Sequence, residues 1–371
     1  MITFRRAALG GLALVASGAM LAACAAPPAP ESSDGPSAAP ASDFLPCMVS
    51  DAGGFDDKSF NQLGAEGIEE AAAELGVEPI LVESASDADY GPNIQNLIDQ
   101  GCTMVVTIGF ALSAATVEAA LANPDIEFAI VDDAADNDFD GQTDAPNIKP
   151  LLFDTAEAAF LAGYAAASYS TSGVVGTFGG APFPTVSIFM DGFAQGVAYY
   201  NEANGANVTV LGWDTAAQDG SFVSSDPAIA FQPGPLPLQI AQGFIDQGAD
   251  VIFPVGGPIY QSAVAAIESS GKEIPILGVD ADVYETDPSV ASYLLTSVRK
   301  LIDVAVYDAV IAAGNGEFDS EPYVGTLENQ GVGIAPFHDY EDKVKPGLAE
   351  ELQAIAEQIV AGEITVGSYL K

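Results

Sequence analysis

A short sequence pattern recurs once in this chain, and it constrains the fold more than any other feature. The tetrapeptide Ile-Asp-Gln-Gly occupies residues 98–101 and again residues 245–248, 147 residues later, each time before an apolar run. At a spacing of 148, Ala129–Asp132 is similar to Leu277–Asp280. Two matches in the same order at nearly one spacing indicate a duplicated unit. The chain is therefore predicted to contain two similar lobes.

The local pattern within each unit predicts an α/β lobe. From Pro46 onward, short β-branched runs alternate with stretches of helical spacing, which is typical of parallel sheets whose strands are joined by helices. Phe60–Leu75 has apolar residues at helical spacing, and Gly76 is placed to end that helix. The predicted strands are 47–50, 80–83, 104–108, 127–131, 174–178, 208–211, 251–255 and 274–279.

Four small or acidic residues fall at the ends of predicted strands. Ligands of open α/β sheets bind beyond the carboxyl ends of the strands. Gly109 and Asp132 occupy such positions in the first unit, and Gly256 and Asp280 occupy them in the second. If the two lobes face each other, these four residues line one cleft from both sides.

The first predicted strand adds an acid, an aromatic ring and an amide. Asp51 follows the strand, and Phe60 and Asn61 open the next helix. Carboxylates suit a ligand rich in hydroxyl and N–H donors, and stacking of a base on an aromatic ring contributes roughly 1–3 kcal/mol. A neutral nucleoside meets both demands. Each aspartate taken singly is better explained as a helix N-cap, so it is the set of three that favours a site.

The charge balance excludes several kinds of protein and draws attention to one lysine. Lys and Arg number 10 against 52 Asp and Glu, giving a net charge of −42, so nucleic-acid phosphates would be repelled. His338 is the single histidine, which excludes His-based metal sites and Ser-His-Asp catalysis. In so acidic a chain, Lys300 near the Asp280 strand end would keep that carboxylate ionised and donate to the same ligand hydroxyl.

The first 43 residues read as an export signal and a tether. Arg5 and Arg6 precede an apolar run that ends in Leu21-Ala22-Ala23-Cys24. We predict a signal peptide over 1–23, a lipid on Cys24, and a flexible tether over 24–43 rich in Pro, Ala and Ser. The predicted location is the extracytoplasmic face of the cell membrane.

The residues from Val49 to Gln62 closely resemble the opening motif of the basic membrane protein family. This family comprises ABC transporter substrate-binding lipoproteins, and its best-understood members are purine nucleoside receptors. Further similar stretches follow in family order, namely 128–132, 157–163, 179–192, 250–257, 278–280 and 295–300. The resemblance implies a type I periplasmic-binding-protein fold with two Rossmann-like lobes, a hinge and a central cleft. It also implies a chain that closes on a purine nucleoside and presents it to a permease.

The resemblance also implies a role for individual residues. The nucleoside base would be held by Asp51, Phe60 and Asn61, with Asp132 contributing from the same lobe. On the opposite lobe Phe189 is the expected aromatic residue, and Phe183 competes for this role. The ribose hydroxyls would be held by Gly256, Asp280 and Lys300, with Asp282 a less favoured choice of acid. Residues 214–237 are longer and richer in proline than the family leads us to expect, and they would reshape the cleft mouth.

The predicted domain boundaries make each lobe discontinuous. Lobe I is expected to contain 44–153 plus 285–322, and lobe II 154–284 plus 323–371. The chain would then cross between the lobes near Asp154, Tyr284 and Tyr323.

Two further features concern a disulfide and a metal. Cys47 and Cys102 begin the first and third predicted strands, which are neighbours in the common 2-1-3 order. Neighbouring strands bring two cysteines within disulfide reach, and export supplies an oxidising compartment, so we expect a disulfide between them.

Oxygen ligands of a calcium-binding loop would come from Asp136, Asp138, Asp140 and Asp144. Position 12 of that loop is Asn147 and not a bidentate glutamate, so no metal is predicted and a solvated acidic linker is favoured.

The prediction is a monomeric, non-enzymatic binding protein without a cofactor, and three alternatives stay open. A sugar- or polyol-binding protein of the same fold would use the carboxylates without needing both aromatic residues. A sensor would pass the ligand signal to a membrane kinase. A nucleoside-cleaving hydrolase would need two acids flanking one bond with separated pKa values, a spacing that the sequence does not demand.

Overall fold

The computed structural model describes residues 43–370. The predicted signal peptide, Cys24 and nearly all of the tether lie outside the described residues. Within residues 43–370, no helix combines the length and the apolar composition of a membrane span.

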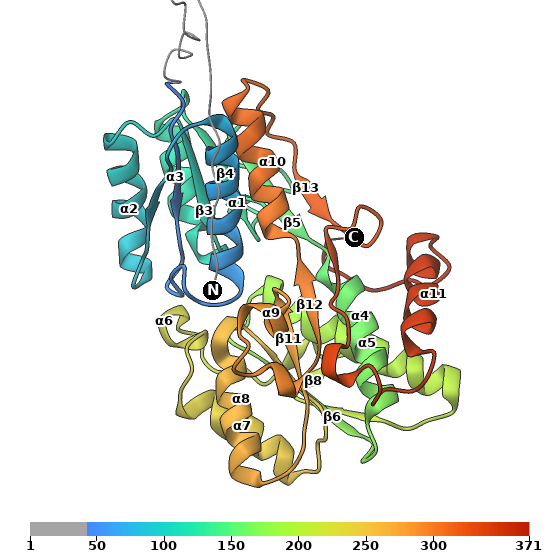
Figure 1. Ribbon diagram of the computed structural model, residues 1–371. Coiled ribbons are helices and arrows are strands. Elements are labelled where there is room, and N and C mark those ends of the chain that lie inside the picture. The colour runs from blue at the N-terminus through green and yellow to red at the C-terminus, as the bar shows by residue number, and fades with distance from the viewer. Residues whose placement is uncertain (1–42, 371) are drawn as a thin grey trace, which may run out of the picture. The chain divides into compact units, whose positions relative to one another are not determined.

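A six-stranded sheet forms the core of the first lobe (Figure 1). Its strand order is β13-β5-β4-β3-β1-β2, and all neighbouring strands run parallel. The strands are β1 (Pro46–Val49), β2 (Ile80–Val82), β3 (Met104–Ile108), β4 (Glu127–Val131), β5 (Ile148–Phe153) and β13 (Tyr323–Gly325). The helices of this part of the chain are α1 (Phe60–Leu75), α2 (Asp87–Asp99), α3 (Ser113–Ala122) and α10 (Ile302–Gly314), with a 3-10 turn over Phe110–Leu112.

A second six-stranded sheet, in the order β14-β12-β11-β10-β6-β7, forms the core of the second lobe. Only β14 runs antiparallel to its neighbour. The strands are β6 (Val174–Gly179), β7 (Thr209–Leu211), β10 (Ile252–Val255), β11 (Ile276–Asp280), β12 (Leu294–Lys300) and β14 (Val332–Ile334), and a separate hairpin pairs β8 (Trp213–Asp214) with β9 (Asp219–Gly220). The helices are α4 (Thr155–Tyr169), α5 (Pro184–Asn204), α6 (Pro227–Ala230), α7 (Pro235–Asp246), α8 (Tyr260–Ser270), α9 (Val283–Thr286) and α11 (Leu348–Val360), with 3-10 turns over Gly257–Ile259, Ala291–Tyr293 and His338–Tyr340.

Glycines allow two helix pairs to pack with their backbones in contact. A methyl group at Gly67 of α1 would collide with the backbone of Asp303 in α10, and these two helices lie side by side in Figure 1. In the second lobe, a methyl group at Gly163 of α4 would collide with the backbone of Phe193 in α5. Interiors are close-packed, so these positions exclude larger side chains.

The duplicated pattern of the sequence is repeated in the backbone conformation. Gly109 and Gly256 both have positive φ, at 113° and 150°. Asp132 and Asp280 adopt the left-handed conformation at 65° and 66°, which is uncommon for a residue with a side chain. Each lobe therefore ends its equivalent strands with residues of positive φ, and the two aspartates share the same left-handed conformation.

Two of the three crossings between the sheets differ from the expected boundaries. The chain leaves the first sheet after Phe153, and α4 follows immediately. Strand β12 was expected in lobe I because 285–322 was assigned there, but it pairs with β11 in the second sheet, so the next crossing follows Lys300 and not Tyr284. Strand β13 belongs to the first sheet, so the last crossing follows Gly325 and not Tyr323. The buried run 294–300 continues the second sheet.

The predicted disulfide joins Cys47 of β1 to Cys102. Their Cα atoms are 6.0 Å apart, within the range that a disulfide spans. Strand β1 pairs with β3, as the 2-1-3 order requires, so the cysteine ahead of β3 lies within reach of the cysteine in β1.

Candidate ligand-binding site

A pocket lies where the carboxyl ends of the strands of both sheets meet. It contains about 750 Å³ of space not filled by protein atoms, part of it open to solvent. This is within the range of small-molecule sites. The residues that line it come from both lobes and include all eight ligand-binding residues predicted from the sequence: Asp51, Phe60, Asn61, Asp132, Phe189, Gly256, Asp280 and Lys300.

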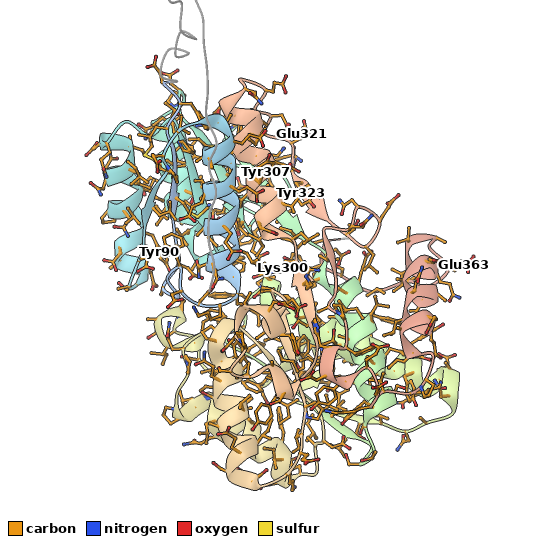
Figure 2. All side chains as sticks on the ribbon, viewed as in Figure 1. Tyr90, Lys300, Tyr307, Glu321, Tyr323 and Glu363 are labelled. Atoms are coloured by element: carbon orange, nitrogen blue, oxygen red, sulfur yellow. A yellow bond between two sulfur atoms is a disulfide. The ribbon has the colours of Figure 1, made fainter. Side chains whose placement is uncertain are left out.

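Lys300 is the last residue of β12 and lies between the two lobes (Figure 2). Its ammonium group forms an ion pair with Asp132 of the first lobe, and it lies 3.6 Å from Oδ1 of Asp280 in the second. The same ammonium group lies 5.1 Å from the ring centre of Phe60 and 5.0 Å from that of Phe189. The two aspartates thus face one shared space and not separate surfaces.

Burial acts on the protonation of these acids. Asp132 and Asp280 are each 6% exposed, so desolvation raises the pKa of both carboxyl groups. The positive charge of Lys300 opposes this effect, and the pKa of Asp280 settles at about 6. Two buried carboxylates near one ammonium group leave unsatisfied acceptor capacity in the pocket, which ligand hydroxyl groups could use.

Asp51, which also lines the pocket, is held in place by its neighbours. Its Oδ1 accepts hydrogen bonds from the Gly53 amide and from Nδ2 of Asn61, both at 2.8 Å. Nδ2 of Asn61 also donates to Asp57. Oδ1 of Asn61 accepts a hydrogen bond from the backbone amide of Asp51. The side-chain amide of Asn61 therefore already has hydrogen-bond partners within the protein. Desolvation raises the pKa of Asp51 to about 6.

Three aromatic rings close the pocket toward the second lobe. Phe110 of the first lobe lies 5.1 Å from Phe183 of the second, measured between ring centres. Phe183 in turn lies 6.0 Å from Phe231, which follows α6. Phe231 also packs against Gly180 and Gly256, where an added methyl group would collide with its ring. The glycines at these strand ends thus leave room for an aromatic ring.

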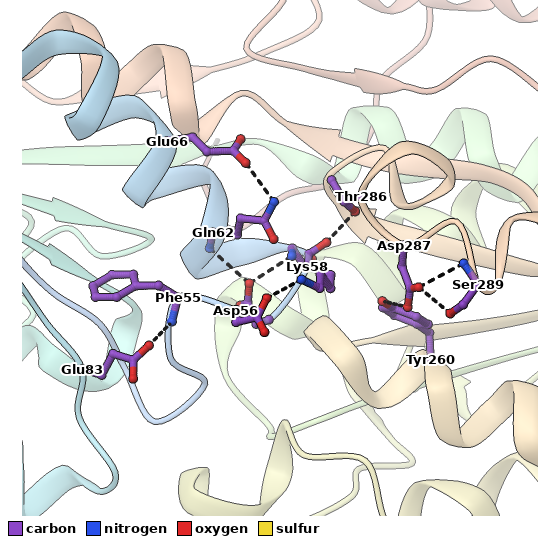
Figure 3. Close-up of polar contacts among 12 residues, drawn as sticks. Phe55, Asp56, Lys58, Gln62, Glu66, Glu83, Tyr260, Thr286, Asp287 and Ser289 are labelled. Atoms are coloured by element: carbon purple, nitrogen blue, oxygen red, sulfur yellow. Dashed lines mark hydrogen bonds and ion pairs between the residues drawn. The ribbon is translucent and has the colours of Figure 1, made fainter. Parts of the chain in front are cut away.

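Polar contacts across the cleft hold the lobes together at the pocket's edge. Oγ1 of Thr286 donates to the backbone oxygen of Lys58 at 2.6 Å (Figure 3). Oγ of Ser59 donates to the backbone oxygen of Val279 at 2.9 Å. Gln232 of the proline-rich segment donates to the backbone oxygen of Ala52 at 3.3 Å. These bonds join the first lobe to three different parts of the second, which describes a closed arrangement.

The structure separates one of the two pairs of alternatives that the sequence left open. Phe189 and Phe183 both line the pocket, Phe189 near Lys300 and Phe183 against Phe110. Asp280 lines the pocket, whereas Asp282 lies outside its lining and bonds with Nε2 of His338 at 2.9 Å.

Other lining residues were missed by the sequence reasoning. They are Asp57, Tyr90, Phe110, Thr185, Pro227 and Phe231, among others. Phe231 lies in the proline-rich segment 214–237, which was expected to reshape the cleft mouth. The sequence therefore pointed to this segment but not to Phe231 itself. Tyr90 carried no signal because a tyrosine in an amphipathic helix is usually a packing residue.

The acidic loop brings together three of its four predicted oxygen donors. Carboxylate oxygens of Asp136, Asp138 and Asp144 lie within 4.8 Å of one another. Asp140 instead donates its backbone amide to Asp136 and Asp138. Backbone amides thus satisfy part of the acceptor capacity of the acidic cluster.

Comparison with known proteins identifies similar sequences along the whole chain. A family model described as "ABC transporter substrate-binding protein PnrA-like" matches residues 44–224. The "CD4+ T-cell-stimulating antigen" of Listeria monocytogenes is 28% identical over 370 residues, covering 95% of this chain and 96% of that protein. The "ABC transporter nucleoside-binding protein BmpA" of Lactococcus lactis is 28% identical over 378 residues, covering 97% and 98%.

Solved structures support the fold. An ABC transporter solute-binding protein from Aeropyrum pernix superposes with a TM-score of 0.75 at 22% identity, covering 88% of this chain and 94% of that one. The resemblance and the two-lobe α/β fold predicted from the sequence are confirmed by these matches.

Proposed function

We propose that the chain is a PnrA-like ABC transporter substrate-binding protein and that it binds a purine nucleoside between its lobes; the match of that family model to residues 44–224 and the similarity to a nucleoside-binding relative support this. The relatives are binding proteins of transporters, so the chain is a binding protein and not an enzyme. The observation that carries the proposal is the meeting of Asp132, Asp280 and Lys300 in one pocket with aromatic walls.

The charged end of the pocket suits the ribose. A ribose hydroxyl is both a donor and an acceptor, so it can give its hydrogen to Asp280 and accept one from Lys300. These residues are buried, and hydrogen bonds to charged groups contribute about 1.5–3 kcal/mol each. Gly256 also lines the pocket, where its lack of a side chain leaves room for the Phe231 ring.

The aromatic walls of the pocket suit the base. Phe60 of the first lobe and Phe231 of the second both line the pocket. Two such rings offer faces on which a purine can stack, at roughly 1–3 kcal/mol per base. Phe231 is part of the segment between α5 and α7, and Asp51 adds a carboxylate to the lining. A free sugar would use the charged end and leave these rings without a partner.

The charge of the lining disfavours nucleotides. Asp51, Asp57, Asp132 and Asp280 line the pocket, and Lys300 is the single cation among the lining residues. A phosphate group would add about two negative charges to this surplus of carboxylates. The low effective dielectric constant of a buried pocket would strengthen the resulting repulsion. The pocket therefore favours the neutral nucleoside over its phosphate esters.

The proposal extends to delivery of the ligand. Export and a lipid on Cys24 would place the protein on the extracytoplasmic face of the membrane, beside a permease that takes up the released nucleoside. The similarity of the chain to ABC transporter substrate-binding proteins supports this arrangement. Radiolabelled fatty acid should be incorporated into the expressed protein, and the Cys24→Ser variant should incorporate none.

Calorimetric titration tests the binding proposal. Inosine, guanosine, adenosine and ribose are titrated into the purified protein and into two variants. Asp280→Ala should weaken nucleoside binding by more than about 1.4 kcal/mol, or tenfold. Asp246→Ala, on the surface of α7, is the control and should leave the affinity unchanged. Unchanged affinity in Asp280→Ala would remove this residue from the site.

The same panel separates the alternatives. Ribose that binds as tightly as inosine would favour a sugar-binding protein. Release of hypoxanthine from inosine during a long incubation would indicate a hydrolase.

A further inference from the structure

Tyr90 is a buried pocket residue whose hydroxyl group has no partner. It lies in the first turns of α2, and Figure 2 places it at the edge of the first lobe that faces the second. Its side chain is 2% exposed and lines the pocket. Within the described part of the chain, the hydroxyl makes no hydrogen bond. The backbone amide of Ala52 lies close by, but an amide N–H is itself a donor and cannot accept the hydroxyl hydrogen.

The position of the ring is well determined by its surroundings. Ser86 and Asp89 form a capping box at the start of α2, which fixes this turn of the helix. The ring packs in the apolar core beside β1 and β3. A phenylalanine would satisfy that packing equally well, whereas a buried hydroxyl without a partner costs about 1–3 kcal/mol. The hydroxyl is thus best explained by a partner that arrives with the ligand.

Few hydrogen-bond donors are free near Asp51 and Tyr90. The amide of Asn61 already donates to Asp51 and Asp57. Oδ2 of Asp51 accepts no hydrogen bond from the described residues and lies beside Gly109, where an added methyl group would be 3.0 Å away. The free groups there are therefore one acceptor, Oδ2 of Asp51, and one donor, the hydroxyl of Tyr90.

We propose that Asp51 and Tyr90 together read the N1–H and O6 edge of a 6-oxopurine, with Tyr90 donating to O6. This inference rests on the proposed nucleoside function and adds the class of base. Inosine and guanosine present a donor at N1 and an acceptor at O6, which match the two free groups in order. Adenosine presents an acceptor at N1, which would face the ionised Asp51 carboxylate, so the pocket selects against it.

The protonation of the two groups agrees with these roles. Desolvation and then the nearby Asp51 carboxylate raise the pKa of Tyr90 well above its usual value, so the phenol keeps its hydrogen. The pKa of Asp51 is raised to about 6, so the carboxylate is mostly ionised at pH 7.5 and accepts from N1–H.

A cycle of protein and ligand changes tests the inference. Inosine and purine riboside, which lacks both O6 and the N1 hydrogen, are titrated into the unmodified protein and the Tyr90→Phe variant. The variant should bind inosine about tenfold more weakly and purine riboside with unchanged affinity. Tyr307→Phe is the matched control, because this partly buried tyrosine of α10 donates to Glu74 and is not among the pocket's lining residues, and the variant should bind both ligands normally. Adenosine should bind the unmodified protein more weakly than inosine.

The outcomes distinguish this inference from the function on which it rests. If the unmodified protein binds no nucleoside, the proposed function and the inference both fail. If it binds inosine and Tyr90→Phe binds it equally well, the inference alone is overturned. An equal loss for both ligands would assign Tyr90 a structural role and would also overturn it. Should the variant fold poorly, equal affinity of the unmodified protein for inosine and purine riboside would contradict the inference independently.

Discussion

Replacing Lys300 with methionine should destabilise the protein strongly and in a pH-dependent way. The change keeps the length of the side chain but removes the ammonium group that pairs with Asp132 and Asp280. Both aspartates would then be buried without a cation. Removing one partner of a buried ion pair costs about 3–5 kcal/mol, so Lys300→Met should lower the free energy of unfolding by this amount at pH 8.

The pH dependence follows from the pKa values of the two acids. Burial already raises them, and loss of Lys300 would raise them further. A carboxyl group with a raised pKa in the folded state contributes stability at low pH that is lost as the pH rises through that pKa. The variant should therefore recover more than half of its deficit at pH 5, below the pKa of about 6 for Asp280 in the unmodified protein.

Urea unfolding followed by circular dichroism at pH 5 and pH 8 measures the free energy of unfolding of the variant and of the unmodified protein. Lys149→Met is the control, because its ion pair with Asp319 is partly exposed and should contribute at most about 1 kcal/mol. A Lys300→Met deficit below 1 kcal/mol, or one of equal size at both pH values, would refute the reasoning.

Three other changes have defined outcomes. Asp51→Asn should flatten the pH dependence of the melting temperature in the ligand-free protein. The raised pKa of Asp51, about 6, makes the unmodified protein lose stability from pH 5 to pH 8. Identical slopes of melting temperature against pH for the two proteins would count against this. Phe231→Ala should weaken inosine binding by roughly 1–3 kcal/mol while ribose binding, measured by the same titration, stays unchanged. Replacing Cys47 and Cys102 with alanine should lower the free energy of unfolding by about 2–5 kcal/mol, and a reducing agent should reproduce this loss in the unmodified protein only.

The sequence predicted the lobes and the acids for one physical reason. Asp132 and Asp280 stand at the carboxyl ends of buried strands, and a parallel sheet brings such ends to one edge. The duplication then implied two edges facing one cleft. Lys300 was found because a lysine is rare in so acidic a chain, and its contact with acids of both lobes follows from its place at the end of β12.

The features that were missed depend on contacts between distant segments. The placement of β12 is decided by its pairing with β11, and the turn-rich residues between them gave no sign of it. Phe231 reaches the pocket because Gly180 and Gly256 leave space for its ring. The role of Tyr90 depends on an unpaired hydroxyl, which no sequence pattern reveals.

The crystal structure of the protein grown with inosine tests the central claim most directly. We expect the ribose hydroxyls within hydrogen-bond distance of Asp280 and Lys300, and the base between Phe60 and Phe231. Inosine bound outside the cleft, or a cleft that stays empty at saturating inosine, would contradict the account.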